Sequence, residues 1–351
     1  MSELRRDPLT DRWVIISTER AARPNDTNES KKPKMGFCPF CPGNEDKTPL
    51  PEIYSVQKNG CSRHNVFDAE QIKKSDWRVR VVPNKFPALQ IESSGKRKAE
   101  GLYDKMGGLG AHEVIIETTE HVSEIPDLPL HQVVLILNTL KLRMHDLERD
   151  IRFRYLSLFK NKGEDAGASL QHPHWQLTAL PITPSEVARE LRCCKAHYDE
   201  KERCLICDLL SYELEKGERI VESNEAFVVL APFASRFAGE LFIAPSPDAH
   251  YHDFTGADDK TMEMLAPVLQ RSLTRLSRKF NDPPYNIYMH TSPFWRKPRN
   301  WHGETIKDDY HWHIHIEPRM GKIAGFELGN DCCINTASPE SVAKLLREAA
   351  V

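Results

Sequence analysis

Two halves of this 351-residue chain carry the same succession of motifs, and this internal repeat limits the possible folds more than any other feature. The first half runs from Cys38-Pro39-Phe40-Cys41 to His172-Pro173-His174-Trp175-Gln176. The second half runs from Cys204-Leu205-Ile206-Cys207 to His311-Trp312-His313-Ile314-His315. A repeat of whole supersecondary units indicates that one fold has been duplicated.

The segments between these motifs predict the α+β class. Short apolar segments typical of strands lie at 77–82, 112–116, 226–230 and 241–243. Helical patterns occupy 130–152, 262–280, the middle of 181–199, and 339–349, whereas the Gly- and Lys-rich segment 93–110 predicts an exposed loop. Antiparallel strands with helices, without regular βαβ alternation, favour α+β. We therefore expect two tandem domains, 1–195 and 196–351, each a mainly antiparallel sheet with helices.

Composition argues against nucleic acid and membrane as partners. The net charge of −3 gives no general attraction to either polyanion. No apolar run approaches the roughly 18 residues that span a bilayer, and the N-terminal residues lack the apolar core of a secretory signal. Nine cysteines, four of them in two Cys-x-x-Cys pairs, indicate metal binding in a reducing compartment rather than a disulfide framework. We expect a cytoplasmic protein.

The segment from His172 to Gln176 has the pattern of a catalytic strand. In a strand, His172, His174 and Gln176 would project from one face. Proline is tolerated at sheet edges or strand starts, and an edge would leave His174 beside open space for a phosphate. An imidazole is a good nucleophile near neutral pH, and Gln176 can donate to a phosphoryl oxygen without transferring protons. A metal-binding or core histidine pair is the alternative.

The pattern H-P-H-x-Q resembles the active-site signature of the galactose-1-phosphate uridylyltransferases, a branch of the histidine triad superfamily. The resemblance implies that His174 becomes uridylylated, that His172 binds zinc, and that Gln176 contacts the phosphoryl group. It implies a nucleotide sugar and a sugar 1-phosphate as partners, with UMP passing from UDP-glucose to galactose 1-phosphate. It also implies a homodimer whose pockets are shared between subunits.

Cys38 and Cys41 have the spacing that lets two thiolates bind one tetrahedral ion, for which zinc is favoured. The resemblance supplies His112 and His172 as the other two ligands. A thioredoxin-like redox pair would need a βαβ context that the surrounding sequence lacks. Four protein ligands leave no open coordination position, so the expected role is structural: holding the strand that carries His174.

By the repeat, a second zinc site should form from Cys204, Cys207, His250 and His311, with His252 as the competitor for His250. A plant relative with ADP-glucose phosphorylase activity resembles this chain in keeping such a cysteine pair. The second Cys-x-x-Cys therefore leaves a second function open.

A third group of ligands is suggested by the 290–315 segment, which holds five of the 15 histidines. Trp301-His302-Gly303 and the His313-x-His315 pair resemble the iron-binding segments of uridylyltransferases, and Glu190 has the family's spacing from Gln176. We expect an iron or zinc site made of Glu190, His302, His313 and His315. Glu317 is the alternative to His313, and a histidine surface without metal stays open.

The loop 161–169, before the catalytic strand, is rich in glycine and small residues that let backbone amides approach phosphate. Two arginines near residue 20 match the family's basic pair near the phosphates, where guanidinium groups bind in bidentate fashion. The resemblance assigns substrate contacts to Arg20, Arg23, Asn84, Asn161, Gly167 and Ser169. Residues 321–333 match the family's acceptor-binding segment only loosely, so the acceptor sugar is the least defined feature.

Other functions fit parts of this pattern. An adenylyl-transferring phosphorylase acting on ADP-glucose or a dinucleoside polyphosphate is favoured by the second Cys-x-x-Cys. A histidine triad hydrolase would carry histidine in place of Gln176. A zinc-ribbon nucleic-acid-binding protein is disfavoured by the acidic balance and by more than 150 residues between the cysteine pairs.

Overall fold

The computed structural model describes residues 2–22, 36–74, 76–294 and 304–351. The strands are β1 Glu3–Arg6, β2 Trp13–Ile16, β3 Glu52–Gln57, β4 Ser62–Val66, β5 Trp77–Pro83, β6 Arg97–Glu100, β7 Tyr103–Met106, β8 Ala111–Ile116, β9 Tyr155–Lys162, β10 His174–Leu180, β11 Ile220–Ser223, β12 Phe227–Leu230, β13 Leu241–Pro245, β14 Tyr285–His290, β15 His313–Pro318 and β16 Cys333–Asn335. The α-helices are α1 Ala69–Lys73, α2 Leu130–Glu148, α3 Ser185–Lys201, α4 Leu205–Lys216, α5 Asp259–Phe280, α6 Ile306–Asp309, α7 Gly325–Asn330 and α8 Pro339–Arg347.

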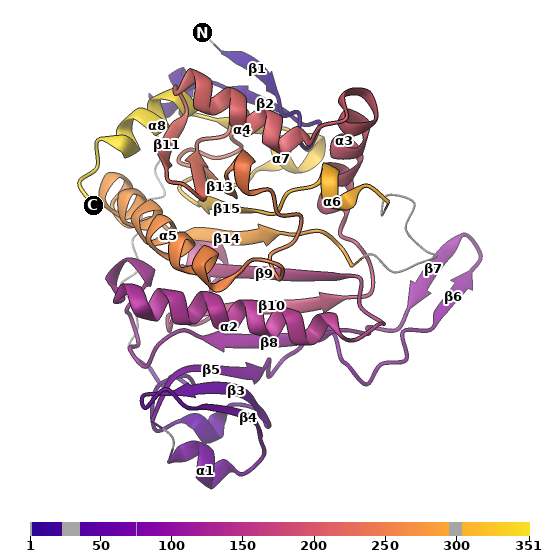
Figure 1. Cartoon of the computed structure of the whole chain (residues 1–351), viewed down its shortest axis with the longest axis vertical. Coiled ribbons are helices and arrows are strands. Elements are labelled where there is room, and N and C mark those ends of the chain that lie inside the picture. Colours follow the sequence, from indigo (N-terminus) through magenta and orange to yellow (C-terminus); the bar gives the residue numbers. More distant parts are fainter. Residues whose placement is uncertain (1, 23–35, 75, 295–303) are drawn as a thin grey trace.

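The main sheet carries the duplication that the sequence predicts. Its strand order is β11-β12-β13-β15-β14-β9-β10-β8-β5-β3-β4, and neighbouring strands in it run antiparallel (Figure 1). Counting outward from the β9–β14 junction, β9-β10-β8-β5-β3 corresponds to β14-β15-β13-β12-β11. The α+β class with two tandem histidine-triad-like units is confirmed, and the two units share one continuous sheet.

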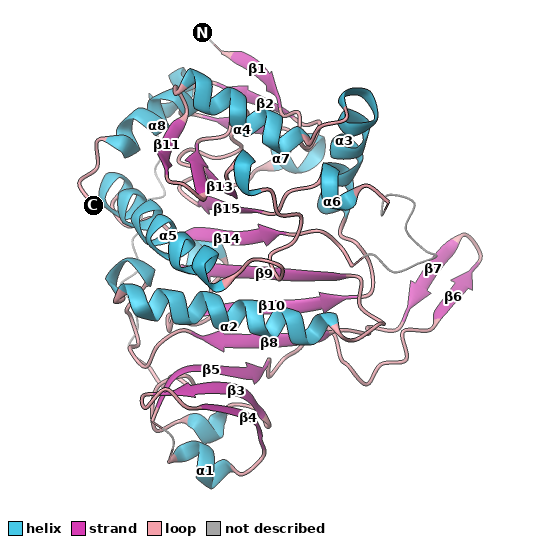
Figure 2. Ribbon diagram, viewed as in Figure 1, coloured by secondary structure: helices cyan, strands magenta, loops and turns pink. Residues whose placement is uncertain are grey.

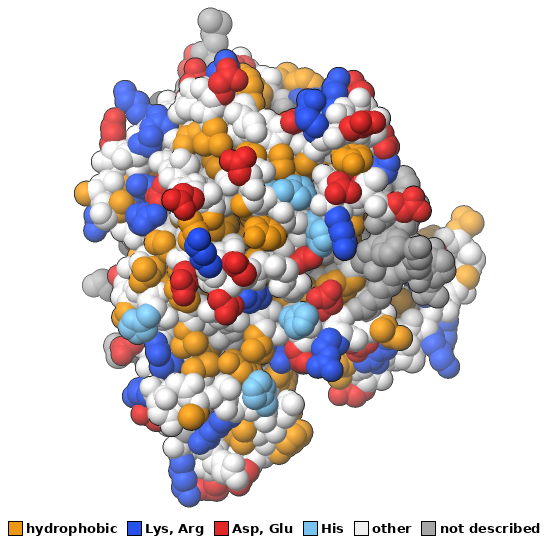
Figure 3. All heavy atoms as spheres, viewed as in Figure 1, with side chains coloured by type: hydrophobic (Ala, Val, Ile, Leu, Met, Phe, Trp, Pro, Cys, Tyr) orange, Lys and Arg blue, Asp and Glu red, His pale blue; other side chains and the backbone are white. Residues whose placement is uncertain are grey.

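Helices α2 and α5 lie across the same face of the sheet (Figure 2). Their apolar residues, such as Leu137 and Leu269, share one buried core with residues of both halves, such as Leu158 and Ile287. Burial of this shared apolar surface is the main force that holds the helices to the sheet. On this face, basic and acidic side chains are interspersed rather than segregated (Figure 3).

The opposite face is covered differently in the two halves. Helices α3 and α4 cover the second half. Their residues Leu191 and Leu210 form a second apolar core together with Phe242. On the first half, Cys38 and Phe40 pack in a small cluster with Ile116. The part of this face that carries His174 and Gln176 is only half-buried.

Several expectations are corrected by the structure. Strand β10 lies between β8 and β9 rather than at an edge, and Pro173 precedes its first residue, so the proline removes no hydrogen bond of the strand ladder. Residues 97–106 form the projecting β6–β7 hairpin within the segment expected to be a loop (Figure 1). The expected boundary between residues 195 and 196 falls within α3, and the domain division stays a prediction.

Strands from the first 16 residues and from residues 333–335 pair in a small separate sheet. Its order is β1-β2-β16, and β16 runs parallel to β2. Ser338 caps α8, because its side chain accepts a hydrogen bond from Ser341 N. Within the described ranges, no helix combines the length and apolar character needed to cross a membrane.

Candidate active site

His174 occupies the first position of β10, and its ring is held in one tautomer. Its Nδ1 lies 2.8 Å from the carbonyl oxygen of His172. A carbonyl oxygen only accepts, so Nδ1 carries the hydrogen and the lone pair lies on Nε2. Burial lowers the pKa of His174, which keeps the ring neutral near pH 7. Phe40 packs edge-on against the ring, with centroids 5.3 Å apart. The arrangement presents Nε2 as a nucleophile.

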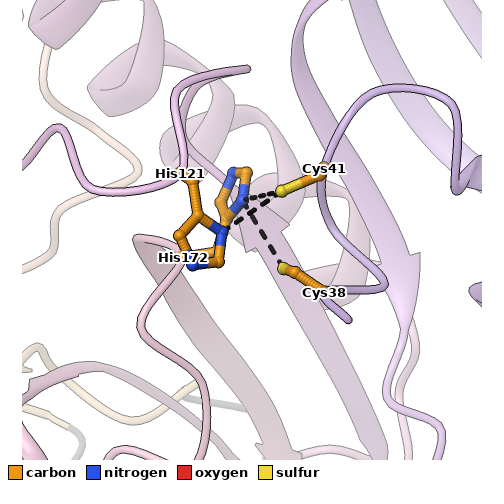
Figure 4. A group of neighbouring side chains, drawn as sticks. All are labelled: Cys38, Cys41, His121 and His172. Atoms are coloured by element: carbon orange, nitrogen blue, oxygen red, sulfur yellow. Dashed lines mark hydrogen bonds between the residues drawn. The ribbon is translucent and has the colours of Figure 1, made fainter. Parts of the chain in front are cut away.

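The residue two positions earlier belongs to a cluster of potential metal ligands formed by Cys38, Cys41, His121 and His172 (Figure 4). His172 Nε2 donates to the carbonyl of Thr118 at 2.8 Å, so its Nδ1 carries the lone pair. This Nδ1 lies 3.8 Å from Cys38 Sγ and 3.6 Å from Cys41 Sγ. His121 Nδ1 lies 3.2 Å from Cys41 Sγ. The unprotonated nitrogen of His172 therefore faces both sulfur atoms.

These spacings fit a tetrahedral ion. Zinc–sulfur and zinc–nitrogen bonds of about 2.3 and 2.1 Å place neighbouring ligand atoms roughly 3.4–3.8 Å apart. Burial and the adjacent Cys38 raise the pKa of the Cys41 thiol to about 11. If both cysteines lost their protons, the two neighbouring thiolates would repel one another, and a bound cation would remove that repulsion. The cluster can hold a metal ion.

The expected ligand His112 is wrong, and His121 takes its place. His112 lies within β8, on the face that carries Gln176, and its Nε2 is 3.0 Å from Gln176 Oε1. His121 follows β8 by five residues, just as His250 follows β13 by five residues. The two spacings are equal only when they are counted from the strand ends that the structure gives, so the sequence alone did not distinguish His121.

The second cluster brings together the four residues that the repeat predicts: Cys204, Cys207, His250 and His311. Cys207 Sγ lies 3.2 Å from His250 Nδ1 and 3.3 Å from His311 Nδ1. His250 Nε2 donates to the Lys307 carbonyl at 2.8 Å, which leaves Nδ1 free to bind a metal. The competitor His252 pairs instead with Asp253 and Ser292.

The third cluster contains Glu190, His290, His313 and His315. The expected ligand His302 lies outside the described residues, and His290 was not assigned by the sequence pattern. Glu190 Oε1 accepts from His290 Nδ1 at 2.7 Å, and its Oε2 lies 3.7 Å from His313 Nε2. Burial opposes ionisation, but the neighbouring His290 and His313 lower the pKa of Glu190 well below its usual range.

The unpaired nitrogens of this third cluster fit a bound cation. In the described part of the chain, His313 Nε2 and both ring nitrogens of His315 have no hydrogen-bond partner although they are buried. Unpaired buried nitrogens are costly unless something binds them. The alternative ligand Glu317 lies elsewhere, paired with Arg236 and Tyr288.

The loop between β9 and β10 has the geometry expected of a phosphate-binding segment. Gly163 has φ +84°, and a Cβ there would approach Pro284 Cβ to 2.9 Å, so no other residue fits without strain. Gly167 also has positive φ, +81°, and ends a short 3₁₀ helix, Glu164–Ala166. Asn161 Oδ1 accepts from Asn286 Nδ2 at 2.9 Å. Ser169 is exposed. The loop thus leads directly into β10 and keeps Ser169 exposed.

Asn84 lies close to the strand that carries His174, whereas Arg20 lies next to a strand of another sheet. Asn84 Nδ2 is 3.1 Å from His112 Nε2, which in turn contacts Gln176. Arg20 lies, exposed, in a short 3₁₀ helix after β2, and β2 belongs to the small sheet rather than to the sheet of β10. Arg23 lies outside the described residues.

The duplicated sheet presents the fixed imidazole of His174 on one of its central strands. A family model described as "Galactose-1-phosphate uridyl transferase, N-terminal domain" matches residues 1–184. The chain belongs to this family of enzymes.

Relatives in the family match over nearly the whole chain. An ADP-glucose phosphorylase of Arabidopsis thaliana is 33% identical over 99% of this chain and 92% of its own length. A galactose-1-phosphate uridylyltransferase of Thermotoga maritima is 29% identical over 100% and 99%, respectively. The crystal structure of an Arabidopsis ADP-glucose phosphorylase with bound ADP-glucose has a TM-score of 0.82 at 32% identity, covering 100% of this chain and 99% of that one.

Proposed function

We propose that the chain is a nucleotidyltransferase that moves UMP from UDP-glucose to galactose 1-phosphate through a covalent bond to His174. The family match and the relatives that are uridylyltransferases support this activity. The observation that carries the proposal is the hydrogen bond from His174 Nδ1 to the His172 carbonyl, which leaves Nε2 as the nucleophile.

In the first step, the lone pair of His174 Nε2 forms a bond to the α-phosphorus of UDP-glucose. The bond from that phosphorus to the bridging oxygen breaks, and the oxygen leaves with the electron pair as glucose 1-phosphate. In the second step, a phosphate oxygen of galactose 1-phosphate bonds to the phosphorus, the N–P bond breaks, and the neutral ring returns. Between the steps the ring is cationic, and its Nδ1–H remains bonded to the His172 carbonyl. Positioning supplies most of the acceleration of phosphoryl transfer.

Gln176 is proposed to contact the phosphoryl group from the same face of β10. Its amide donates a hydrogen bond but cannot remove a proton from water. The intermediate is therefore stabilised without being hydrolysed. This property suits transfer to a second substrate rather than hydrolysis.

We propose zinc for the two clusters of two cysteines and two histidines, because two thiolates and two imidazoles form the set that zinc prefers. In the first cluster, the metal would hold His172, whose carbonyl orients His174. For the cluster of Glu190 with three histidines we propose iron or zinc, since its ligands are nitrogen and oxygen.

A second candidate is a phosphorylase in which inorganic phosphate accepts AMP from His174, with ADP-glucose or a dinucleoside polyphosphate as donor. The second cysteine–histidine cluster favours it. So does the 33% identity with the Arabidopsis phosphorylase, against 29% with the Thermotoga uridylyltransferase. Both candidates use the same histidine and differ in base and acceptor.

Intact mass spectrometry tests the mechanism and separates the candidates. The protein is incubated with UDP-glucose and, separately, with ADP-glucose, without acceptor. We expect a UMP adduct on the native chain and none on His174→Ala. An AMP adduct alone would favour the phosphorylase, and normal turnover by His174→Ala would refute both candidates.

We also propose a homodimer in the cytoplasm. The family resemblance supports the dimer, and light scattering of the purified protein measures it directly. The nine cysteines, all within the described residues, form no disulfide bond, a state that a reducing compartment maintains.

A further inference from the structure

We infer that His112 is a positioning residue that fixes the amide of Gln176 so that its NH₂ group, and not its oxygen, faces the reacting phosphoryl group. The inference rests on the proposed function, because it concerns the contact that Gln176 makes there. The family resemblance assigned His112 to metal binding, and the inference gives this histidine a different role.

The sheet brings the two side chains together. In the ladder between β8 and β10, His112 lies opposite Thr178, so Gln176 is its diagonal neighbour on the same face. His112 Nε2 lies 3.0 Å from Gln176 Oε1. Both side chains are half-buried, so water competes less for this hydrogen bond than at an open surface.

The surroundings of the ring select its tautomer. The backbone amide of Ala88 donates to His112 Nδ1 at 3.3 Å, which makes Nδ1 the unprotonated nitrogen. Nε2 then carries the hydrogen and donates to Gln176 Oε1. In the other tautomer, Nε2 would accept from Asn84 Nδ2, 3.1 Å away, but Nδ1–H would oppose the Ala88 amide hydrogen. The Ala88 contact therefore favours donation to Gln176.

This hydrogen bond decides which end of the amide is available to substrate. A glutamine amide has an accepting oxygen at one end and a donating NH₂ group at the other. With Oε1 held by His112, the NH₂ group is the free end. If the amide turned over, its oxygen would face the anionic phosphoryl oxygens and repel them. Donors aimed at developing charge contribute most when they are fixed before the reaction.

The same ring also contacts the segment that holds Asn84 and Ala88. Asn84 is the residue expected to contact the nucleoside, and its Oδ1 is fixed by the Phe86 amide at 2.9 Å. His112 thus lies between the nucleoside-binding segment and the phosphoryl contact. When the ring is changed, the Phe86 amide still holds Asn84. We therefore expect the rate of adduct formation to change more than the affinity for the nucleotide sugar.

The test compares His112→Phe, which keeps a ring without a donor, with His112→Gln, which restores an N–H donor. The rate of adduct formation on His174 is measured by rapid quench with the nucleotide sugar that labels the native chain. We expect His112→Phe to lower this rate on the order of 100-fold with little change in the concentration for half-maximal rate. We expect His112→Gln to recover most of it. In a Gln176→Ala background, His112→Phe should have no further effect.

Metal content and thermal unfolding of each variant are measured alongside. An unchanged rate in His112→Phe, an additive loss in the Gln176→Ala background, or the loss of one metal equivalent would overturn the inference. If His112→Phe does not fold, His112→Gln is the deciding variant. A fall in its rate of adduct formation as large as that of Gln176→Ala would overturn the inference. Absence of any adduct on the native chain would instead refute the proposed function.

Discussion

At the scale of single residues, two histidines in equivalent positions have the same backbone contact and different surroundings. His313 Nδ1 donates to the carbonyl of His311 at 3.0 Å, as His174 Nδ1 donates to that of His172. His313 is fully buried and stacks on Phe242, with ring centroids 4.7 Å apart. A fixed tautomer is therefore shared by both halves, but only His174 is left accessible to a substrate.

His313→Ala should retain nucleotidyl transfer on His174 and lose stability. Removal of a fully buried ring leaves a cavity, and we expect the free energy of unfolding to fall by about 2–4 kcal/mol. Urea unfolding and intact mass after incubation with the nucleotide sugar measure the two effects. His145→Ala on the exposed side of α2 is the control, with no change in either. A folded His313→Ala protein that forms no adduct would contradict this assignment of roles.

At the scale of elements, the two clusters of cysteines and histidines lie where strands begin and end. In the first half, the segment before β10 and the segment after β8 each supply a histidine, and the Cys38 loop supplies the thiols. In the second half, the segments before β15 and after β13 each supply a histidine. The backbone is least constrained beyond the ends of a strand, where the hydrogen bonds of the sheet no longer hold it. A bound ion there would fix that part of the backbone.

Cysteine variants should separate the two clusters. We expect Cys38→Ser to lose one metal equivalent per chain and at least 10-fold in adduct formation, because His172 would no longer be held and its carbonyl orients His174. Cys204→Ser should lose one metal equivalent and stability while His174 still reacts. Plasma emission analysis and intact mass measure these effects, with the exposed Cys61→Ser as control. Equal loss of activity in both cluster variants would show that the clusters do not act separately.

The repeat and the longer helices, but not all of the strands or ligands, could be predicted from the sequence. Helical periodicity found α2 and α5, because each buries one apolar stripe against the sheet. His112 and His121 were confused, because spacing along a strand does not reveal whether a histidine lies within the ladder or beyond its end. The central position of β10 was missed for a related reason: Pro173 lies just outside the strand, and the sequence does not give that boundary to one residue.

At the scale of the whole molecule, the β9–β14 pairing turns a duplicated unit into one body. The pairing runs from Tyr285 opposite Lys162 to Met289 opposite Leu158. Helices α2 and α5 pack against one another across the same junction. Because neither half completes its apolar core alone, the two halves should unfold together rather than in sequence.

Calorimetry of the full chain should therefore give one transition for both halves. Ile287 is fully buried in the core shared by both halves, and Ile287→Ala should move that whole transition, lowering the free energy of unfolding by about 2–5 kcal/mol. Ile151→Ala, at an 81% exposed site, is the matched control and should leave the transition in place. Two separate transitions, of which Ile287→Ala moves only one, would show instead that each half is stable by itself and that the continuous sheet is a contact between independent units.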